Sequence, residues 1–275
     1  MRLPFLKMHG CGNDYVYVDG CHSQLPPDMS QLAVQISDRH RGIGSDGLVV
    51  ALPPETPAAQ IRMQMLNADG SEGGMCGNAL RCLAMWMHRE NRIPAESRIQ
   101  TRDRIVEARV LQLEDNTRSA IVSVCLGSGV VDPEDISLPD VTVEDRPVLL
   151  RRVDVGNPHA VIFVNHLSSI SLHDTGPGIE RHSLFPDRTN VEFVQVEASG
   201  RLRVNVWERG SGATLACGSG AVASVAAAMV TGRVDENGLV EVHMPGGILQ
   251  VERDTVNQYW LTGPAVESFH GIWYW

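Results

Sequence analysis

The chain has 275 residues, of which 43% are hydrophobic and 20% are charged, and its formal net charge is −10. This length is typical of about two domains of ~150 residues each, and the composition is that of a globular protein. Because nucleic-acid binding requires a basic surface, the acidic balance argues against non-specific binding of DNA or RNA.

Strand-like segments dominate the first half of the chain. Runs rich in β-branched residues and bounded by Gly, Pro or Asp occupy residues 15–19, 47–52, 61–66, 104–113 and 120–124. A helix is expected within residues 29–39. A second helix should begin near Cys76, because apolar residues recur from there at helical spacing and the segment stops before Pro94.

The second half repeats this pattern. Its strand-like runs are residues 159–164, 190–196, 201–208, 239–244 and 247–252. The segment 218–231 is apolar nearly all round, which predicts a buried helix that ends at Gly232. Because strands and helices do not alternate regularly, we predict an α+β fold.

The two halves also share the order and spacing of small motifs. The motif GND precedes an alternating strand in the first half, and GNPH does so in the second. From Asn13 to Cys76 is 63 residues, and from Asn157 to Cys217 is 60 residues. Chance recurrence is the alternative, but the match favours a duplicated unit: two pseudo-symmetric domains, residues 1–118 and 119–263, with helix starts at a shared cleft.

Amino-acid chemistry through pyridoxal phosphate is disfavoured. Enzymes of that class hold the cofactor as a Schiff base on a lysine, and Lys7, in an N-terminal strand, is the single lysine of the chain. The scattered histidines, and the spacing of Cys76 and Cys82, form no metal-ligand pattern. We therefore expect neither a cofactor nor a metal.

The N-terminal segment MRLPFLKMHG lacks the apolar core of a signal peptide. The longest apolar run, residues 221–230, is shorter than the ~20 residues that cross a membrane. We expect a cytoplasmic protein without membrane contact. In that reducing compartment the six cysteines, none in a CxxC pattern, should be thiols.

Cys76 and Cys217 each stand at the start of an expected helix, in CGN and CGS. The first turn of a helix leaves backbone N–H groups unpaired and carries partial positive charge. Such a site binds carboxylates, and it lowers the pKa of a nearby thiol so that thiolate is accessible near neutral pH. We therefore single out these two thiols.

The residues after each cysteine suit a carboxylate. Gly77 and Gly218 let the backbone approach a ligand closely, and Asn78 and Ser219 add side-chain donors. A carboxylate whose α-carbon lies between two thiols has the geometry for two-base proton exchange, in which one thiolate removes a proton and the other thiol returns one to the opposite face. Such an inversion needs no cofactor.

Other interpretations of the cysteines remain open. We take Cys11, Cys21, Cys82 and Cys125 as small buried hydrophobes. A thiol redox protein is the rival from another class, since facing thiols can oxidise to a disulfide. That reaction would more reasonably inactivate the protein than be its purpose.

Several longer motifs resemble the diaminopimelate epimerase family: KMHGCGNDY, RGIGSDG, NADGSEGGMCGNALRC, GNPHAVIFV and ERGSGATLACGSGA. The resemblance implies a cofactor-independent epimerase that interconverts LL- and meso-diaminopimelate, on the pathway to lysine and peptidoglycan precursors. It implies two domains, each with strands curled around a central helix and the site between them. In that fold residues 264–275 complete the N-terminal domain, and a homodimer is possible, with Phe269 near its interface.

The resemblance also assigns residues by motif. Cys76 and Cys217 become the acid/base thiols, while His159 and Glu208 tune them and receive the substrate ammonium. Residues implied at the substrate are Asn13, Asn67, Gly77, Asn78, Asn157, Asn190, Glu208, Arg209, Gly218 and Ser219. Those at the distal end suit their role, because Asn both donates and accepts and Arg binds a carboxylate bidentately.

The sequence departs from the family pattern at Gly47, Ala79 and Ala213. The family often has Gln, Gly and Glu at these places. A racemase of another amino acid, such as histidine, with the same thiol pair therefore stays an alternative. A proline racemase relative is less favoured, because the distal Asn and Arg set suits a substrate with a second amino-acid end.

Overall fold

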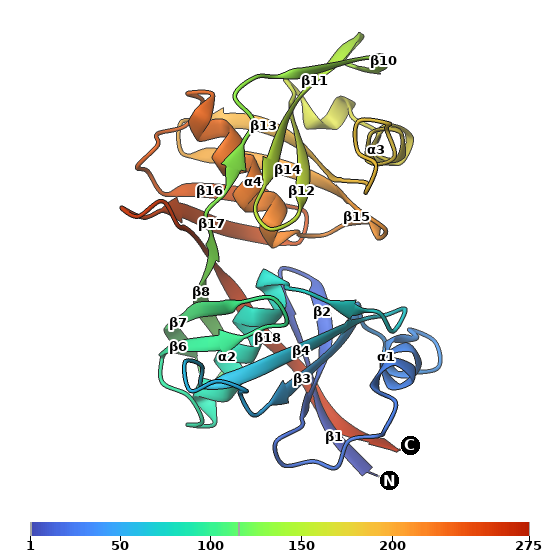
Figure 1. The fold of residues 1–275 in the computed structure, drawn as a ribbon, viewed down its shortest axis with the longest axis vertical. Coiled ribbons are helices and arrows are strands. Elements are labelled where there is room, and N and C mark those ends of the chain that lie inside the picture. Colours follow the sequence, from blue (N-terminus) through green and yellow to red (C-terminus); the bar gives the residue numbers. More distant parts are fainter. Residues whose placement is uncertain (1, 115, 275) are drawn as a thin grey trace. The chain divides into compact units, whose positions relative to one another are not determined.

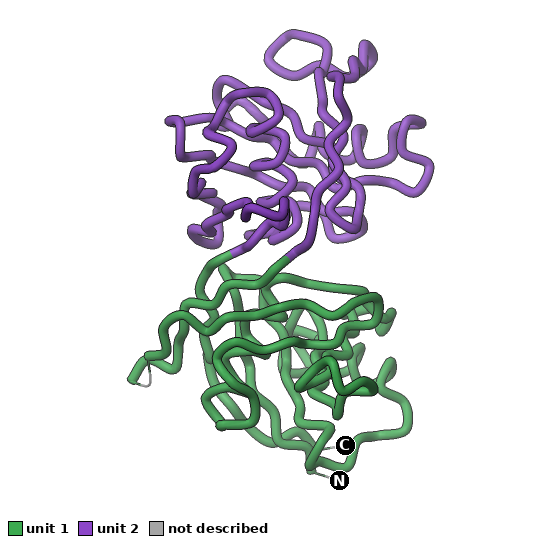
Figure 2. The backbone as a smooth tube through the Cα atoms, turned by 60° about the vertical axis from the view of Figure 1, so that its left-hand side comes forward, with its two compact units in different colours: residues 1–125, 262–275 green, residues 126–261 purple. Residues whose placement is uncertain are grey.

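The computed structural model describes residues 2–114 and 116–274 (Figure 1). The chain forms two compact units, residues 1–125 with 262–275 and residues 126–261 (Figure 2). Strands β8 (Ser119–Gly127) and β18 (Tyr259–Tyr274) carry the chain from one unit to the other. The boundaries expected from the sequence, 118/119 and 263/264, fall near these crossings.

The first unit is a closed barrel. Besides β8 and β18, its strands are β1 (Arg2–Gly10), β2 (Asn13–Asp19), β3 (Gly47–Leu52), β4 (Ile61–Asn67), β5 (Glu72–Gly73), β6 (Glu96–Gln100) and β7 (Ile105–Glu114). β1 pairs with β2 and β18, β2 with β3, β3 with β4, β4 with β6, β6 with β7, β7 with β8, and β8 with β18, so the pairing returns to its first strand.

Helix α2 (Gly77–Arg89) fills this barrel. It is buried from Gly77 to Met87 and packs against β1, β2, β6 and β7 (Figure 1). The helix ends where Asn91 takes a left-handed φ of 56° and Arg92 N–H donates to Met87 O at 2.9 Å. The helix expected from Cys76 to before Pro94 is confirmed.

Helix α1 (Met29–Ser37) packs against strands β3 and β4. Asp28 is its N-cap and accepts a hydrogen bond from Gln31 N at 2.8 Å. Leu32 and Ile36, one turn apart, are buried against this part of the sheet. The helix expected within 29–39 is therefore confirmed.

The second unit curls its sheet around helix α4 (Gly218–Val230). The strands of this unit are β9 (Val130–Val131), β10 (Ile136–Val143), β11 (Arg146–Asp154), β12 (Pro158–Phe163), β13 (Asn190–Ala198), β14 (Arg201–Glu208), β15 (Gly212–Thr214), β16 (Val240–Met244) and β17 (Gly247–Arg253). The pairing runs β9–β11–β12–β13–β14–β16–β17, and α4 contacts every one of these strands.

Small side chains let the strands approach α4 on all sides. The helix is buried from Gly220 to Met229 and is built mainly of Ala and Val. It ends as the sequence predicts, with Gly232 at a left-handed φ of 66°. In the described part of the chain, none of the helices combines the length and apolar character that a bilayer-spanning helix requires.

The two units share one strand order. A parallel pair, β2–β3 or β12–β13, encloses α1 or α3 (Leu172–Glu180) in its connection. Antiparallel pairs follow, β3–β4 and β4–β5 in one unit and β13–β14 and β14–β15 in the other. Each central helix then leads to another parallel pair, β4–β6 or β14–β16. The predicted α+β fold with two pseudo-symmetric curled sheets is confirmed.

Several elements were not expected from the sequence. Helix α3 contains Pro177 between two glycines, which is an unfavourable helix sequence. Strands β6, β10 and β11 were not singled out, and β18 runs through Gly263 and Pro264. The short 3₁₀ helix η1 (Leu167–Ser169) precedes α3.

Candidate active site

Cys76 lies directly before α2 and forms its N-cap, with extended backbone angles φ −134° and ψ 119°. The residue is half-buried. Its Sγ donates a hydrogen bond of 3.4 Å to Oδ1 of Asn13. Asn13 is the first residue of β2. Since β2 packs on α2, the barrel itself holds this amide against the thiol.

Asn13 joins several polar groups of the first unit. Its Oδ1 also accepts from Nδ2 of Asn78, in the first turn of α2, at 3.1 Å. Its own Nδ2 donates to Oδ2 of Asp46 at 2.8 Å. Burial raises the pKa of Asp46, although hydrogen bonds to the carboxylate and the Arg39 guanidinium act in the opposite direction. The predicted residues Asn13, Cys76 and Asn78 thus form one cluster.

Arg81 belongs to this cluster and was missed in the sequence. Its side chain is fully buried in the barrel, with Nη2 donating to Oδ1 of Asn78 at 2.8 Å and Nε donating to Pro264 O at 3.3 Å. Burial lowers its pKa. The signal available in the sequence was a guanidinium within an otherwise apolar helix, between Leu80 and Cys82.

Cys217 occupies the equivalent place in the second unit. It is the N-cap of α4, with φ −122° and ψ 115°, and is only 7% exposed. Its Sγ accepts from Gly220 N–H at 3.3 Å and lies 3.4 Å from Oγ of Ser219. The sulfur therefore sits on the first turn of its own helix.

The pKa of Cys217 is raised well above that of an ordinary thiol. Burial is the largest cause, and the carboxylates of Glu208 and Glu192 add to it. The contacts from Ser219 and from Gly220 N–H act in the opposite direction but are smaller. The expectation that the helix start lowers the pKa of this thiol was wrong for Cys217, because desolvation and two nearby carboxylates raise that pKa by more.

His159, on β12, connects to the same helix start. Its Nδ1 lies 2.7 Å from Oε1 of Glu192, and both side chains are inaccessible to solvent. Its Nε2 lies 3.1 Å from Oδ1 of Asn157, whose Nδ2 donates to Ser219 Oγ at 3.4 Å. The predicted residues Asn157, His159 and Ser219 are thus brought together, and Glu192 was missed.

The remaining predicted residues of the second unit form a neighbouring group. Asn190, at the start of β13, donates through Nδ2 to Pro158 O at 3.0 Å and accepts from Arg209 N–H at 3.0 Å. The Arg209 guanidinium donates to Asp187 O at 3.2 Å. Glu208 accepts a hydrogen bond of 2.5 Å from Oγ1 of Thr214.

Gly77 and Gly218 begin α2 and α4, and both are buried. Asn67 ends β4, where its Nδ2 donates to Oγ of Ser71 at 3.0 Å. That contact holds the Asn67 side chain in the β4–β5 turn.

The glycine at position 47 is explained by the close approach of the neighbouring strand. A Cβ atom at this place would lie 2.2 Å from the backbone oxygen of Leu66 on the paired strand β4, so β3 could carry a side chain there only after a backbone shift. Ala79 is fully buried in α2, and its carbonyl accepts from the Tyr17 hydroxyl at 3.3 Å. Ala213 is exposed on β15.

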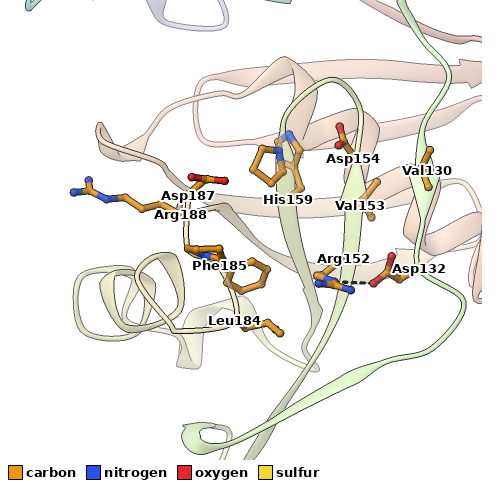
Figure 3. Close-up of a pocket in the computed structure, with 12 residues that line it drawn as sticks. Val130, Asp132, Arg152, Val153, Asp154, His159, Leu184, Phe185, Asp187 and Arg188 are labelled. Carbon is orange, nitrogen blue, oxygen red and sulfur yellow. Dashed lines mark hydrogen bonds and ion pairs between the residues drawn. The ribbon is translucent and has the colours of Figure 1, made fainter.

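A pocket of about 260 Å³ lies in the second unit beside His159 (Figure 3). Carboxylates and guanidinium groups line it, among them Asp132 and Arg152, whose Oδ2 and Nε are 2.7 Å apart. Phe185 contributes its apolar wall. Among the described residues, no group of three or more His, Cys, Asp or Glu side chains is arranged to hold a metal ion.

Known proteins resemble this chain in sequence along almost its whole length. A family model described as diaminopimelate epimerase matches residues 5–128 and 151–267. A diaminopimelate epimerase of Microcystis aeruginosa is 42% identical over 282 residues, covering 99% of both chains. One of Carboxydothermus hydrogenoformans is 42% identical over 286 residues, covering 99% of this chain and 100% of the relative.

The fold has relatives beyond this sequence similarity. The crystal structure of a phenazine biosynthesis protein of the PhzF family from Bacillus anthracis superposes with a TM-score of 0.76 at 13% identity, covering 100% of both chains. That likeness shows the fold alone. Since the family model spans both units and the sequence relatives align over nearly their full length, this chain belongs to the diaminopimelate epimerase family.

Proposed function

We propose that the chain interconverts LL- and meso-2,6-diaminopimelate by proton transfer between the substrate α-carbon and the thiols of Cys76 and Cys217. One observation carries the proposal: the equivalent central helices of the two units both begin at a cysteine whose sulfur contacts side chains of its own cluster. Membership of the diaminopimelate epimerase family supports the choice of substrate.

The chemistry follows from the two helix starts. One cysteine, as thiolate, takes the α-proton and becomes a thiol, and the C–H electron pair passes into the adjoining carboxylate. The other cysteine, as thiol, then gives its proton to the opposite face of the carbon and becomes a thiolate. Atoms and charge balance, the product has the inverted centre, and the thiols have exchanged their protonation states.

The negative charge that develops on the carboxylate needs donors in place before the reaction. The N–H groups in the first turn of a helix, with the positive end of the helix dipole, supply them without reorganisation. At α2 these follow Cys76, beginning with Gly77 and Asn78, and at α4 they follow Cys217, beginning with Gly218 and Ser219. The mechanism requires both sulfur atoms to reach one α-carbon from opposite sides.

The distal end of diaminopimelate carries a second ammonium and carboxylate. We assign its carboxylate to the guanidinium of Arg209, which offers a planar pair of donors. Asn190 fixes the backbone of Arg209 by accepting its N–H at 3.0 Å. Asn157 and Asn67 would complete the distal contacts, since each amide both donates and accepts.

The test is incubation of the purified chain with LL-diaminopimelate in D₂O without added cofactor, followed by chiral separation and mass spectrometry. We expect meso product that carries deuterium at the inverted carbon. L-Histidine is the comparison substrate. Inversion of histidine but not of diaminopimelate would replace the proposed substrate, and thiol oxidation without α-exchange would replace the reaction class.

Two further expectations rest on the resemblance. We infer a homodimer, which the exposed apolar side chains of Phe269 (47% exposed) and Tyr274 (69%) on β18 support. Sedimentation of the wild type and of Phe269→Ala tests this, since a monomeric wild type would contradict it. Action in the cytoplasm stays a prediction.

A further inference from the structure

Glu192 is a fully buried carboxylate in the middle of an apolar strand. It lies on β13 between Val191 and Phe193, and all three residues are inaccessible to solvent. Its Oε1 contacts Nδ1 of His159 at 2.7 Å, while its Oε2 is buried without a hydrogen-bond partner. Because burying a carboxylate is costly and this one is only half satisfied, packing alone does not explain it.

The start of α4 is shaped around this carboxylate. A Cβ atom at position 220 would lie 2.7 Å from Oε1 of Glu192, so a residue larger than glycine would press on the acid. The first helical turn also favours a negative charge beside it. Gly220 N–H donates to Cys217 Sγ at 3.3 Å. The same glycine therefore faces Glu192 on one side and the thiol on another.

An unbroken series of contacts leads from Glu192 to Cys217, all within the second unit. Glu192 Oε1 meets His159 Nδ1 at 2.7 Å, and His159 Nε2 meets Asn157 Oδ1 at 3.1 Å. Asn157 Nδ2 donates to Ser219 Oγ at 3.4 Å. Ser219 Oγ lies 3.4 Å from Cys217 Sγ. The acid and the sulfur are thus connected through three side chains.

The donors in this series have one consistent direction. An amide oxygen only accepts, so Nε2–H of His159 donates to Asn157. Since Ser219 Oγ already accepts from the Asn157 amide, its own hydroxyl proton is left for Cys217 Sγ. The sulfur then receives donors from Ser219 and Gly220, which favours thiolate. If the Asn157 amide turned over, Ser219 would accept from a thiol instead.

We propose that Glu192 is a positioning residue that holds the His159 ring and, through Asn157 and Ser219, sets the direction of the hydrogen bond at Cys217. This inference rests on the proposed function, in which Cys217 alternates between thiol and thiolate. The proton that Glu192 and His159 share lies at the end of the series opposite Cys217. Glu192 contacts no reacting atom itself.

The test is Glu192→Gln, which keeps the size of the side chain and removes its acid group. A buried N–H between an imidazole and a carboxylate gives a far-downfield proton resonance, and His159→Gln assigns it in the wild type. We expect Glu192→Gln to remove this resonance. Misplacing a reacting group costs up to about a hundredfold in rate. In Glu192→Gln we therefore expect kcat to fall about ten- to a hundredfold, while KM changes less than about twofold. The pH profile of kcat should also shift.

Glu180→Gln is the matched control, because it also removes a buried carboxylate of this unit. Glu180 accepts from Trp207 Nε1 at 2.9 Å and has no place in the series. This control should keep the downfield resonance and the shape of the pH profile, even if its melting temperature falls. If Glu192→Gln does not fold, Glu192→Asp, which withdraws the carboxylate by one methylene, takes its place.

The outcomes separate this inference from the proposed function. A wild type that shows the resonance but exchanges no α-proton of diaminopimelate overturns the function and leaves the hydrogen-bond arrangement standing. A wild type without the resonance overturns the arrangement. An active wild type whose resonance is lost in Glu192→Gln without any change in kcat or its pH profile overturns the positioning role.

Discussion

Asn13 Oδ1 lies 3.4 Å from Cys76 Sγ and accepts a hydrogen bond from the thiol. The same oxygen accepts from Asn78 at 3.1 Å, and the amide nitrogen is anchored on Asp46 at 2.8 Å. Because both ends of the amide are bonded, its oxygen cannot turn away from the sulfur. The thiol therefore has a fixed orientation in the first unit.

Asn13→Ala should reduce epimerisation without unfolding the chain. One net hydrogen bond contributes about 0.5–1.5 kcal/mol to stability, whereas losing the orientation of an acid/base group removes part of a ~10²–10⁴-fold contribution to rate. We expect kcat to fall at least about tenfold, measured by chiral separation. Asn165→Ala, which removes an exposed amide bonded to Glu144 at 2.9 Å, is the control and should keep wild-type kcat.

The two helix-start cysteines should be required individually. Replacing either Cys76 or Cys217 by Ala removes one acid/base group, so turnover should fall by about 10² or more. Cys21→Ala is the matched control, because its thiol, which contacts Ala51 O at 3.8 Å, lies at neither helix start. Near-full turnover in either helix-start variant, with circular dichroism unchanged, would contradict two-base transfer.

The pH dependence of Cys217 follows from its raised pKa. An ordinary thiol has a pKa of ~8.5, and only the thiolate is alkylated. The rate at which iodoacetamide alkylates Cys217 should therefore keep rising with pH above that value. Glu208→Gln removes a carboxylate that raises the pKa, so the midpoint should move to lower pH. Peptide mass spectrometry after iodoacetamide pulses measures both chains.

Cys82 controls for unfolding in the same experiment. Cys82 is fully buried and its pKa is raised to about 11, so we expect it to react only when the barrel opens. If Cys217 were modified at the rate of Cys82 at every pH, its reactivity would report unfolding instead of ionisation. The raised pKa of Cys217 also affects the free energy of unfolding. Its stabilising contribution is present below pH ~8.5, the pKa of an unfolded thiol, and is lost as the pH rises toward the pKa of the folded protein.

The helix starts and most strands could be predicted because local sequence determines them. Alternating β-branched runs become strands wherever one face is buried, and CGN or CGS before an apolar run marks a helix start. The match in spacing between the halves extends to strand order, so the duplication inferred from a few motifs applies to the whole topology.

The unpredicted parts depend on contacts between distant segments. Helix α3 contains Gly176, where a Cβ would lie 2.6 Å from Trp207 Cγ, so packing on β14 overrides helix propensity. Glu192 and Arg81 are charged residues, which composition rules place at the surface. Glu192 can be buried because His159, on the neighbouring strand β12, contacts its carboxylate. Arg81 can be buried because Asn78, one turn earlier in α2, accepts a hydrogen bond from its guanidinium.

Tight packing of α4 predicts a cost for added volume. Ala226 is fully buried in a helix that strands surround. Ala226→Leu should therefore destabilise the chain by about 1–3 kcal/mol through overpacking, measured by urea unfolding. Val230→Leu, at a position that is 50% exposed, is the control and should change the free energy of unfolding by less than about 0.5 kcal/mol. Equal effects would contradict a closely packed central helix.

Arg209 should discriminate between substrates that have a distal carboxylate and those that lack it. The Asn190 amide oxygen accepts a hydrogen bond from Arg209 N–H at 3.0 Å, and the Arg209 guanidinium donates to Asp187 O at 3.2 Å. A charge-assisted hydrogen bond contributes about 1.5–3 kcal/mol. Arg209→Ala should therefore raise KM for diaminopimelate about ten- to a hundredfold.

A monocarboxylic analogue of the same chain length separates the possible roles of Arg209. Its binding should change little in Arg209→Ala, because it has no distal carboxylate to lose. Arg209→Lys keeps the charge but not the planar fork, so its KM for diaminopimelate should lie between those of the wild type and Arg209→Ala. Equal losses for both ligands would assign Arg209 to the structure of the β14–β15 turn, where its backbone already bonds to Asn190.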